Sequence, residues 1–221
     1  MPLALVTGAA RADSIAAGIV PRLRSDGWDV VTSDLVDTDY PCDLSDPNAP
    51  GVLVDTIVRE RGILSALVLS HAHGVDASIL DTTAESFDRH MAVNARASLL
   101  LIAGFVRQMD ATGGAVVAFT SDHTTGNLPY GASKGALDRI VISAAREFGD
   151  RGLSANVVNP GPIDTGWMDD ETRAHLTAYQ PSGRLGTPRD IAALTSFLLS
   201  QEGRWVSGQL LSADGGFSIR I

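Results

Sequence analysis

The chain has 221 residues, of which 44% are hydrophobic and 19% are charged, and its formal net charge is −9. An acidic protein repels phosphate backbones, so nucleic acid is excluded as an expected partner, and no Lys/Arg run marks an anionic-membrane patch. The single cysteine excludes an internal disulfide, and neither a signal peptide nor an apolar stretch of about 20 residues is present. These features predict a cytoplasmic globular protein with no membrane partner.

Short apolar runs alternate with helical patterns along the chain. We expect strands at residues 3–7, 29–33, 64–70, 115–120, 155–158 and 209–212. We expect helices at residues 14–25, 49–61, 84–109, 130–149 and 189–199. Strands that are apolar on both faces are typical of a parallel sheet covered by helices. The alternation predicts one α/β domain over residues 1–221, with a doubly wound parallel β-sheet flanked by helices on both faces.

Residues 164–186 form the least regular segment, with many polar residues around Trp167 and Tyr179. Such a segment is typical of a lid over a substrate, although an ordinary surface loop has the same composition. We expect a substrate loop here. We expect Trp28, Trp167 and Trp205 to be packing residues, and of the three only Trp167 lies where a substrate could touch it.

The first predicted strand runs directly into a turn that begins at Gly8. In a dinucleotide site such a turn places helix amides around the pyrophosphate, and the helix dipole favours negative charge. Gly8 allows a close backbone approach, and Ser14, followed by Ile15, can cap the helix and donate to a phosphate. The usual Gly-x-Gly-x-x-Gly is absent, so an ordinary strand–turn–helix junction is the simpler interpretation of this segment alone.

An acid, Asp34, ends the second predicted strand. It can accept hydrogen bonds from the adenosine ribose and would repel a 2′-phosphate, although it can also be an ordinary loop acid. Arg11 in the turn favours the opposite choice, because a cation there can bind a 2′-phosphate. The balance predicts NAD(H), with NADP(H) as the alternative. Asp43 and Leu44 follow where a second loop would close over the adenine.

The strongest motif is Tyr130-Gly-Ala-Ser-Lys134 at the start of a long predicted helix. A spacing of four residues puts the two side chains on one helix face. A phenol has an ordinary pKa of about 10, and a cation beside it lowers that pKa. Tyr130 would then donate a proton to a carbonyl oxygen as a hydride arrives, or accept one in the reverse reaction.

The surroundings of this motif supply further candidates. Ser121 ends a predicted strand, where its hydroxyl would hold a substrate oxygen. Asn94, inside the predicted helix 84–109, would anchor a water in a proton path to Lys134. Four residues that follow the next strand are placed to contact a nicotinamide: Pro160, Gly161, Ile163 and Thr165.

With these motifs, the sequence resembles the short-chain dehydrogenase/reductase family over essentially its whole length. The resemblance is carried by Leu5–Val6–Thr7–Gly8, Val93–Asn94, Thr120–Ser121, Tyr130-x-x-x-Lys134, Asn159–Pro160–Gly161–Pro162, Gly183–Arg184–Leu185–Gly186-x-Pro188-x-Asp190–Ile191–Ala192 and Ala213–Asp214–Gly215–Gly216. The stretches at 159–162 and 183–192 are similar to the 3-oxoacyl-carrier-protein reductase branch.

The resemblance implies a Rossmann-type fold and an NAD(P)-dependent oxidoreductase that interconverts a ketone or aldehyde and an alcohol. It implies a catalytic set of Asn94, Ser121, Tyr130 and Lys134, in which Tyr130 handles the proton and Lys134 also binds ribose. It further implies a homo-oligomer, a tetramer or dimer built on the two long helices.

The sequence departs from the family's pattern in four respects. The turn Gly8-x5-Ser14 is similar to that of the enoyl-reductase group, but the Tyr–Lys spacing is four rather than seven, which favours a ketone/alcohol enzyme. His71, Ala72 and His73 stand within the family's Asn–Asn–Ala–Gly stretch and are expected to alter the wall beside the adenosine ribose. Ser121 precedes Tyr130 by only nine residues, and the short chain predicts trimmed loops and an open site.

Three other interpretations are weighed against this one. His71, His73 and His123 resemble metal ligands, but the lack of an acid or cysteine at ligand spacing favours loop or cofactor-pocket histidines and predicts no metal. The second is a cofactor-binding or scaffold protein with little turnover, against which the complete catalytic set argues. The third, a dehalogenase-like relative, would place Arg at the position of Lys134.

Overall fold

The computed structural model describes residues 1–122, 126–166 and 168–219, so the predictions on His123 and Trp167 lie outside the described residues. One sheet of six parallel strands has the order β2-β1-β3-β4-β5-β6. Its strands are β1 (Leu3–Thr7), β2 (Asp29–Ser33), β3 (Leu64–Leu69), β4 (Gly114–Phe119), β5 (Leu153–Asn159) and β6 (Leu210–Ser212). The strands β1, β4 and β5 lie inside the sheet and are buried along their whole length, as expected of parallel strands covered by helices on both faces.

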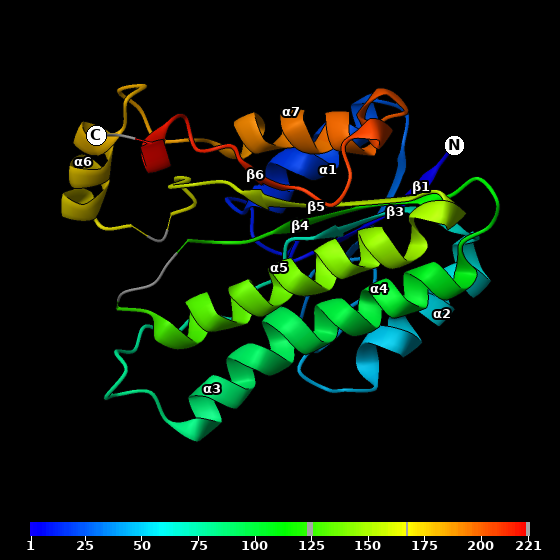
Figure 1. Ribbon diagram of the computed structural model, residues 1–221, viewed down its shortest axis with the longest axis horizontal. Helices are drawn as coiled ribbons and strands as arrows, with labels where there is room; N and C mark the ends of the chain where they lie inside the picture. The colour runs from blue at the N-terminus through cyan, green and yellow to red at the C-terminus, as the bar shows by residue number, and fades with distance from the viewer. Residues whose placement is uncertain (123–125, 167, 220–221) are drawn as a thin grey trace.

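Helices cover both faces of the sheet (Figure 1). They are α1 (Ile15–Ser25), α2 (Ala49–Arg61), α3 (Ala84–His90), α4 (Ala97–Gln108), α5 (Leu128–Phe148), α6 (Asp170–Tyr179) and α7 (Pro188–Leu199). In Figure 1, α2, α4 and α5 lie on one side of the sheet, and α1 and α7 lie on the other. Each side has its own apolar core, one around Phe105 and the other around Ile19. The predicted doubly wound α/β fold is confirmed.

Local sequence explains where several helices begin. The hydroxyl of Ser14 accepts the Ala17 N–H at 3.2 Å and caps α1, as predicted. A reciprocal capping box joins Thr187 and Asp190 at the start of α7, with Pro188 in its first turn. The two helices then pack closely at Gly18, where a Cβ would lie 2.5 Å from the Pro188 carbonyl oxygen.

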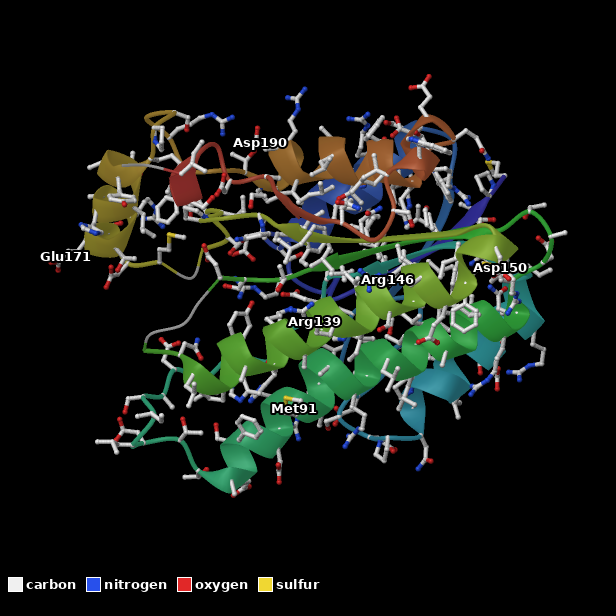
Figure 2. The ribbon with its side chains drawn as sticks, in the orientation of Figure 1. Met91, Arg139, Arg146, Asp150, Glu171 and Asp190 are labelled. Carbon is white, nitrogen blue, oxygen red and sulfur yellow. The ribbon has the colours of Figure 1, made fainter. Side chains whose placement is uncertain are left out.

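Two predicted segments differ from the structure. The expected single helix at 84–109 is interrupted by η1 (Met91–Arg96), a π-helical segment that begins at the labelled Met91 (Figure 2). The segment expected to be irregular, 164–186, contains α6. This helix has no buried residue, so no apolar stripe reveals it in the sequence. Its N-cap Asp169 and the acids at its start, including the outward-pointing Glu171 (Figure 2), are the signals that predict it.

The loop after β2 covers the open edge of the sheet. The Thr32 N–H donates to Asp39 Oδ2 at 2.9 Å, and the Thr32 carbonyl accepts from the Tyr40 N–H at 3.0 Å. The Arg24 side chain donates to the Val30 carbonyl at 3.2 Å. Exposed edge groups of this kind otherwise pair with strands of other molecules. The loop therefore protects the edge strand while it carries the chain toward α2.

Two further predictions concern the packing of the tryptophans and the absence of a membrane-spanning helix. Trp28 packs against the core under α1 and α7, as expected. Trp205 does not: it is 97% exposed, so its prediction as a packing residue is wrong. Within the described ranges, no helix combines the length and apolar character needed to cross a membrane.

Candidate active site

Tyr130 and Lys134 lie one turn apart near the start of α5, where this helix packs on β5 and β4. Lys134 is only 2% exposed, and its ammonium donates to the carbonyl of Phe119, the last residue of β4, at 2.8 Å. The Lys134 nitrogen is 5.6 Å from the centre of the Tyr130 ring, close enough for a cation–π interaction. The predicted pairing of phenol and ammonium is therefore present in the structure.

The protonation of this pair follows from its burial. Burial raises the pKa of Tyr130 to about 12. Burial also lowers the pKa of Lys134 to about 8. The expectation that Lys134 lowers the Tyr130 pKa is not met in this structure, because the ammonium bonds the Phe119 carbonyl and desolvation of the phenol has the larger effect. At neutral pH Tyr130 is a protonated phenol, the form that donates a proton.

Asn94 lies in the π-helical segment η1 and is fully buried. Its Oδ1 accepts the His73 N–H at 2.7 Å, and its Nδ2 donates to the His73 carbonyl at 2.9 Å and to Ser133 Oγ at 2.8 Å. Ser133 Oγ in turn donates to the Tyr130 carbonyl at 2.7 Å. Asn94 thus joins the end of β3 to the turn of α5 that carries Tyr130. Both amide protons are used, so the predicted water would bond to an oxygen of Asn94.

His71 is an internal tether. Its Nδ1 lies 2.7 Å from Thr7 Oγ1, and its Nε2 lies 3.2 Å from the Val93 carbonyl. A carbonyl only accepts, so Nε2 carries the proton and Nδ1 accepts from Thr7. Burial, reinforced by Lys134, lowers the pKa of His71 to about 3, so the ring is neutral. The ring joins β1 to η1 inside the protein, which leaves the exposed Ala72 beside it on the surface.

His73 and His90 form a second histidine contact. Their ring centres are 4.5 Å apart. His90 is fully buried, its Nδ1 lies 2.7 Å from the Ser86 carbonyl, and its Nε2 accepts the Val75 N–H at 3.1 Å. No sequence motif singles out His90. In the part of the chain that the structure describes, no three histidine, cysteine or acidic side chains form a possible metal site.

Ser121 follows β4 by two residues and is partly buried. The Thr120 N–H before it donates to the Val158 carbonyl at 2.9 Å, which extends the sheet toward Ser121. This places Ser121 at the carboxyl end of β4, the edge of the sheet where ligands of α/β proteins bind. That Ser121 holds the substrate oxygen stays a prediction.

The turn after β1 shows why glycine is required at its start. Gly8 has a φ of 71°, and a Cβ there would lie 2.6 Å from the backbone of Ser70 and His71. The helix α1 begins at Ile15, so its first N–H groups face the turn. The Ser14 hydroxyl donates to the Arg11 carbonyl at 2.8 Å, which competes with its predicted donation to a phosphate.

Two charged side chains hold this turn to its neighbours. Asp34 Oδ2 accepts the Ala10 N–H at 3.0 Å, so the acid at the end of β2 contacts the turn. Arg11 donates to both carboxylate oxygens of Asp13, at 3.0 and 2.9 Å, and to the Thr165 carbonyl at 2.8 Å. Arg11 is therefore neutralised by an acid and joins the turn to the loop after β5.

A hollow of about 490 Å³ lies beside this turn. It is lined by the turn, by α1 and by the loop after β2, where Asp37 and Asp39 add acid to the lining. Next along the loop, Asp43 is exposed and accepts the Ser45 N–H at 2.9 Å, whereas the Leu44 side chain is buried in the core. Only the backbone of Leu44 could therefore contact an adenine.

The loop after β5 holds the remaining predicted contacts. Pro160 and Gly161 follow the strand; Gly161 has a φ of 62°, and a Cβ there would clash with Asp214. Ile163 is 6% exposed and forms a bridge with Gly186, so its side chain belongs to the core. The loop therefore presents mainly backbone to a ligand, and Arg11 already occupies the carbonyl of Thr165.

Comparisons with known proteins identify a matching family model, related sequences and solved structures of the same fold. Residues 8–218 match the family model described as "Enoyl-(Acyl carrier protein) reductase". The chain is 34% identical over 241 residues to "Uncharacterized oxidoreductase YjdA" of Bacillus subtilis (strain 168), covering 97% of this chain and 96% of that protein. It is 31% identical over 249 residues to a short-chain dehydrogenase/reductase of Armillaria gallica, with coverage of 97% and 95%.

A solved structure, the angucycline C-6 ketoreductase LanV with bound NADP, superposes with a TM-score of 0.89 at 28% identity, covering 99% of this chain and 96% of that one. These likenesses extend over nearly the whole chain.

Proposed function

The chain belongs to the short-chain dehydrogenase/reductase family. From that premise we propose that it interconverts a ketone or aldehyde and an alcohol, with Tyr130 as the acid–base residue. As a member of this family it is an NAD(P)-dependent oxidoreductase. The observation that carries the proposal is the buried pair on α5, a protonated phenol one turn from an ammonium.

In the proposed reaction, Tyr130, Lys134, Ser121 and Asn94 each have a separate role. A bound nicotinamide dinucleotide supplies the hydride in reduction and accepts it in oxidation. Tyr130 donates its proton to the substrate oxygen, and the Lys134 ammonium stabilises the phenolate that remains and binds ribose. Ser121 orients the substrate oxygen. Asn94 fixes the turn of α5 through Ser133 and supports the proton path.

The turn after β1 fits a dinucleotide. Gly8 lets the backbone fold closely against the end of β3, and the amino end of α1 presents N–H groups to a pyrophosphate. We propose that NAD(H) is preferred, with NADP(H) possible, because Asp34, Asp37 and Asp39 make this end acidic and Asp13 neutralises Arg11. The NADP-bound ketoreductase is the contrary indication.

We also propose the wider setting of the enzyme. Residues 164–186, with α6, serve as the substrate loop. The enzyme is cytoplasmic and assembles as a dimer or tetramer through α4 and α5, where Leu99 is 49% exposed. The 3-oxoacyl-carrier-protein reductase branch suggests a 3-oxo group in the substrate.

The variant Tyr130→Phe tests the proposal. It should lower kcat/KM for ketone reduction by about 10²–10⁴-fold, the usual contribution of a positioned acid. Binding of NADH and NADPH, measured by fluorescence titration of the wild type and the variant, should remain. A scaffold protein would bind cofactor without measurable turnover in either form, and undiminished turnover in the variant would reject Tyr130 as the acid.

A second candidate is reduction of the carbon–carbon double bond of an enoyl thioester. The description of the matching family model and the Gly8-x5-Ser14 turn favour it. The four-residue Tyr–Lys spacing favours the carbonyl. Parallel assays with a 3-oxoacyl and an enoyl thioester decide between them. The absorbance of the reduced nicotinamide, at about 340 nm, should fall only with the thioester that the enzyme reduces.

A further inference from the structure

Asp138 lies on α5 one turn after Lys134 and is partly buried. Its Oδ1 is shielded from solvent and has no hydrogen-bond partner among the residues that the structure describes. Beside it, the Thr120 hydroxyl bonds the Lys134 carbonyl at 3.4 Å. A carboxylate oxygen is thus buried at the carboxyl end of β4, where the catalytic ammonium also lies.

Burying this carboxylate costs free energy unless a nearby group stabilises its negative charge. A buried polar atom without a hydrogen bond loses the stabilisation that water gave it. An uncharged side chain at position 138 would avoid this cost. Besides the Thr120 hydroxyl, two positive charges offset it, the ammonium of Lys134 and the guanidinium of Arg139. Of these two only Lys134 is buried, and opposite charges attract more strongly where water is excluded.

We propose that Asp138 is a positioning residue whose carboxylate keeps Lys134 in its charged form and so extends activity toward alkaline pH. Lys134 must be an ammonium to stabilise the Tyr130 phenolate, and only this last step rests on the proposed function.

The other groups near Lys134 do not supply this charge. His71, from the end of β3, is neutral, and Tyr130 on α5 is a neutral phenol. Burial alone lowers the pKa of Lys134, and Asp138 is the group that opposes this effect. Burial raises the pKa of Asp138, while Thr120, Lys134 and the neighbouring Arg139 on α5 (Figure 2) lower it. Arg139 therefore helps to keep Asp138 ionised.

The test uses the fact that Lys134 is the only lysine in the sequence. Protein labelled with ¹⁵N-lysine gives one side-chain nitrogen signal, whose shift with pH reports the ionisation of Lys134 directly and without turnover. In Asp138→Asn we expect the midpoint to move down by about one pH unit, the effect of removing one opposite charge beside a buried group. Asp138→Glu should restore most of this shift.

Glu147→Gln is the matched control, because it removes one charge from the exposed side of the same helix. Its midpoint should equal that of the wild type. Should Asp138→Asn fold poorly, Asp138→Ser removes the same charge and repeats the measurement. An unchanged Lys134 midpoint in a folded neutral variant overturns the inference.

The kinetic consequence is measured separately. In Asp138→Asn, the alkaline limb of the kcat profile should move to lower pH by about one unit, so that kcat already falls at neutral pH. A shifted NMR midpoint without any turnover in the wild type would reject the proposed function and leave the coupling of Asp138 and Lys134 intact. A lower kcat at every pH with an unmoved midpoint would show a structural role only and overturn the inference.

Discussion

The two ends of the proposed active site are built in different ways. At the catalytic end, Lys134, Asn94 and His71 are buried and are held by the ends of strands and by adjacent helices. At the cofactor end, exposed side chains such as Arg11 join one loop to another. The first kind of geometry comes with the fold, whereas the second can change without disturbing the core. The residues proposed for the chemistry are therefore held by the core of the fold, whereas those proposed to choose the cofactor can vary without disturbing it.

The largest effect should follow from Asn94→Ala, which leaves the partly buried backbone N–H and carbonyl of His73 without their partner and removes one of the two bonds of the Ser133 hydroxyl. We expect the free energy of unfolding to fall by about 3 kcal/mol and turnover to fall further than stability explains. Urea unfolding and kinetics at saturating cofactor measure the two losses.

The matched control is Asn156→Ala in β5, another buried asparagine that bonds backbone at both ends of its amide. It should lose similar stability but keep its turnover. Equal losses of turnover in the two variants would mean that Asn94 supports the fold and not the site.

The next effect concerns His71 and acid. The unfolded chain protonates this histidine below about pH 6.5, while the folded protein does so only near a pKa of about 3. The unfolded state therefore binds more protons between these two pH values. As the pH falls through this range, this group lowers the free energy of unfolding by about 1.4 kcal/mol per pH unit. His71→Asn should flatten that slope in urea titrations from pH 7 to pH 4.

His175→Asn, which replaces an exposed histidine on α6, is the control and should keep the slope of the wild type. If His71→Asn unfolds with the same pH dependence as the wild type, the tether between β1 and η1 is not a source of acid sensitivity.

The smallest effects should come from the cofactor end. Asp34→Ser removes the acid nearest the turn and should shift the ratio of NADPH to NADH affinity by about tenfold toward NADPH, equivalent to 1.4 kcal/mol. Arg11→Ala should change that ratio by less than about twofold, since Asp13 already neutralises this exposed cation. Calorimetric titration with both cofactors measures the ratios. A large loss of NADPH binding in Arg11→Ala would show that Arg11 turns toward a 2′-phosphate.

The sequence predicts the sheet and the neighbouring placement of Tyr130 and Lys134 well for a physical reason. Buried parallel strands are apolar on both faces, and a spacing of four on a helix needs no tertiary information. It predicts η1 poorly, because nothing in the pattern of residues 84–109 marks an extra residue in a turn. The bond from Arg11 to Thr165 spans 154 positions and depends on the folded loops. The exposure of Trp205 contradicts the usual behaviour of a large aromatic residue.

The burial of the only lysine also governs how this protein can be handled chemically. Reagents that acylate lysine side chains meet a single target within these 221 residues, and it is only 2% exposed. Mild acylation of the folded protein should therefore leave Lys134 unmodified.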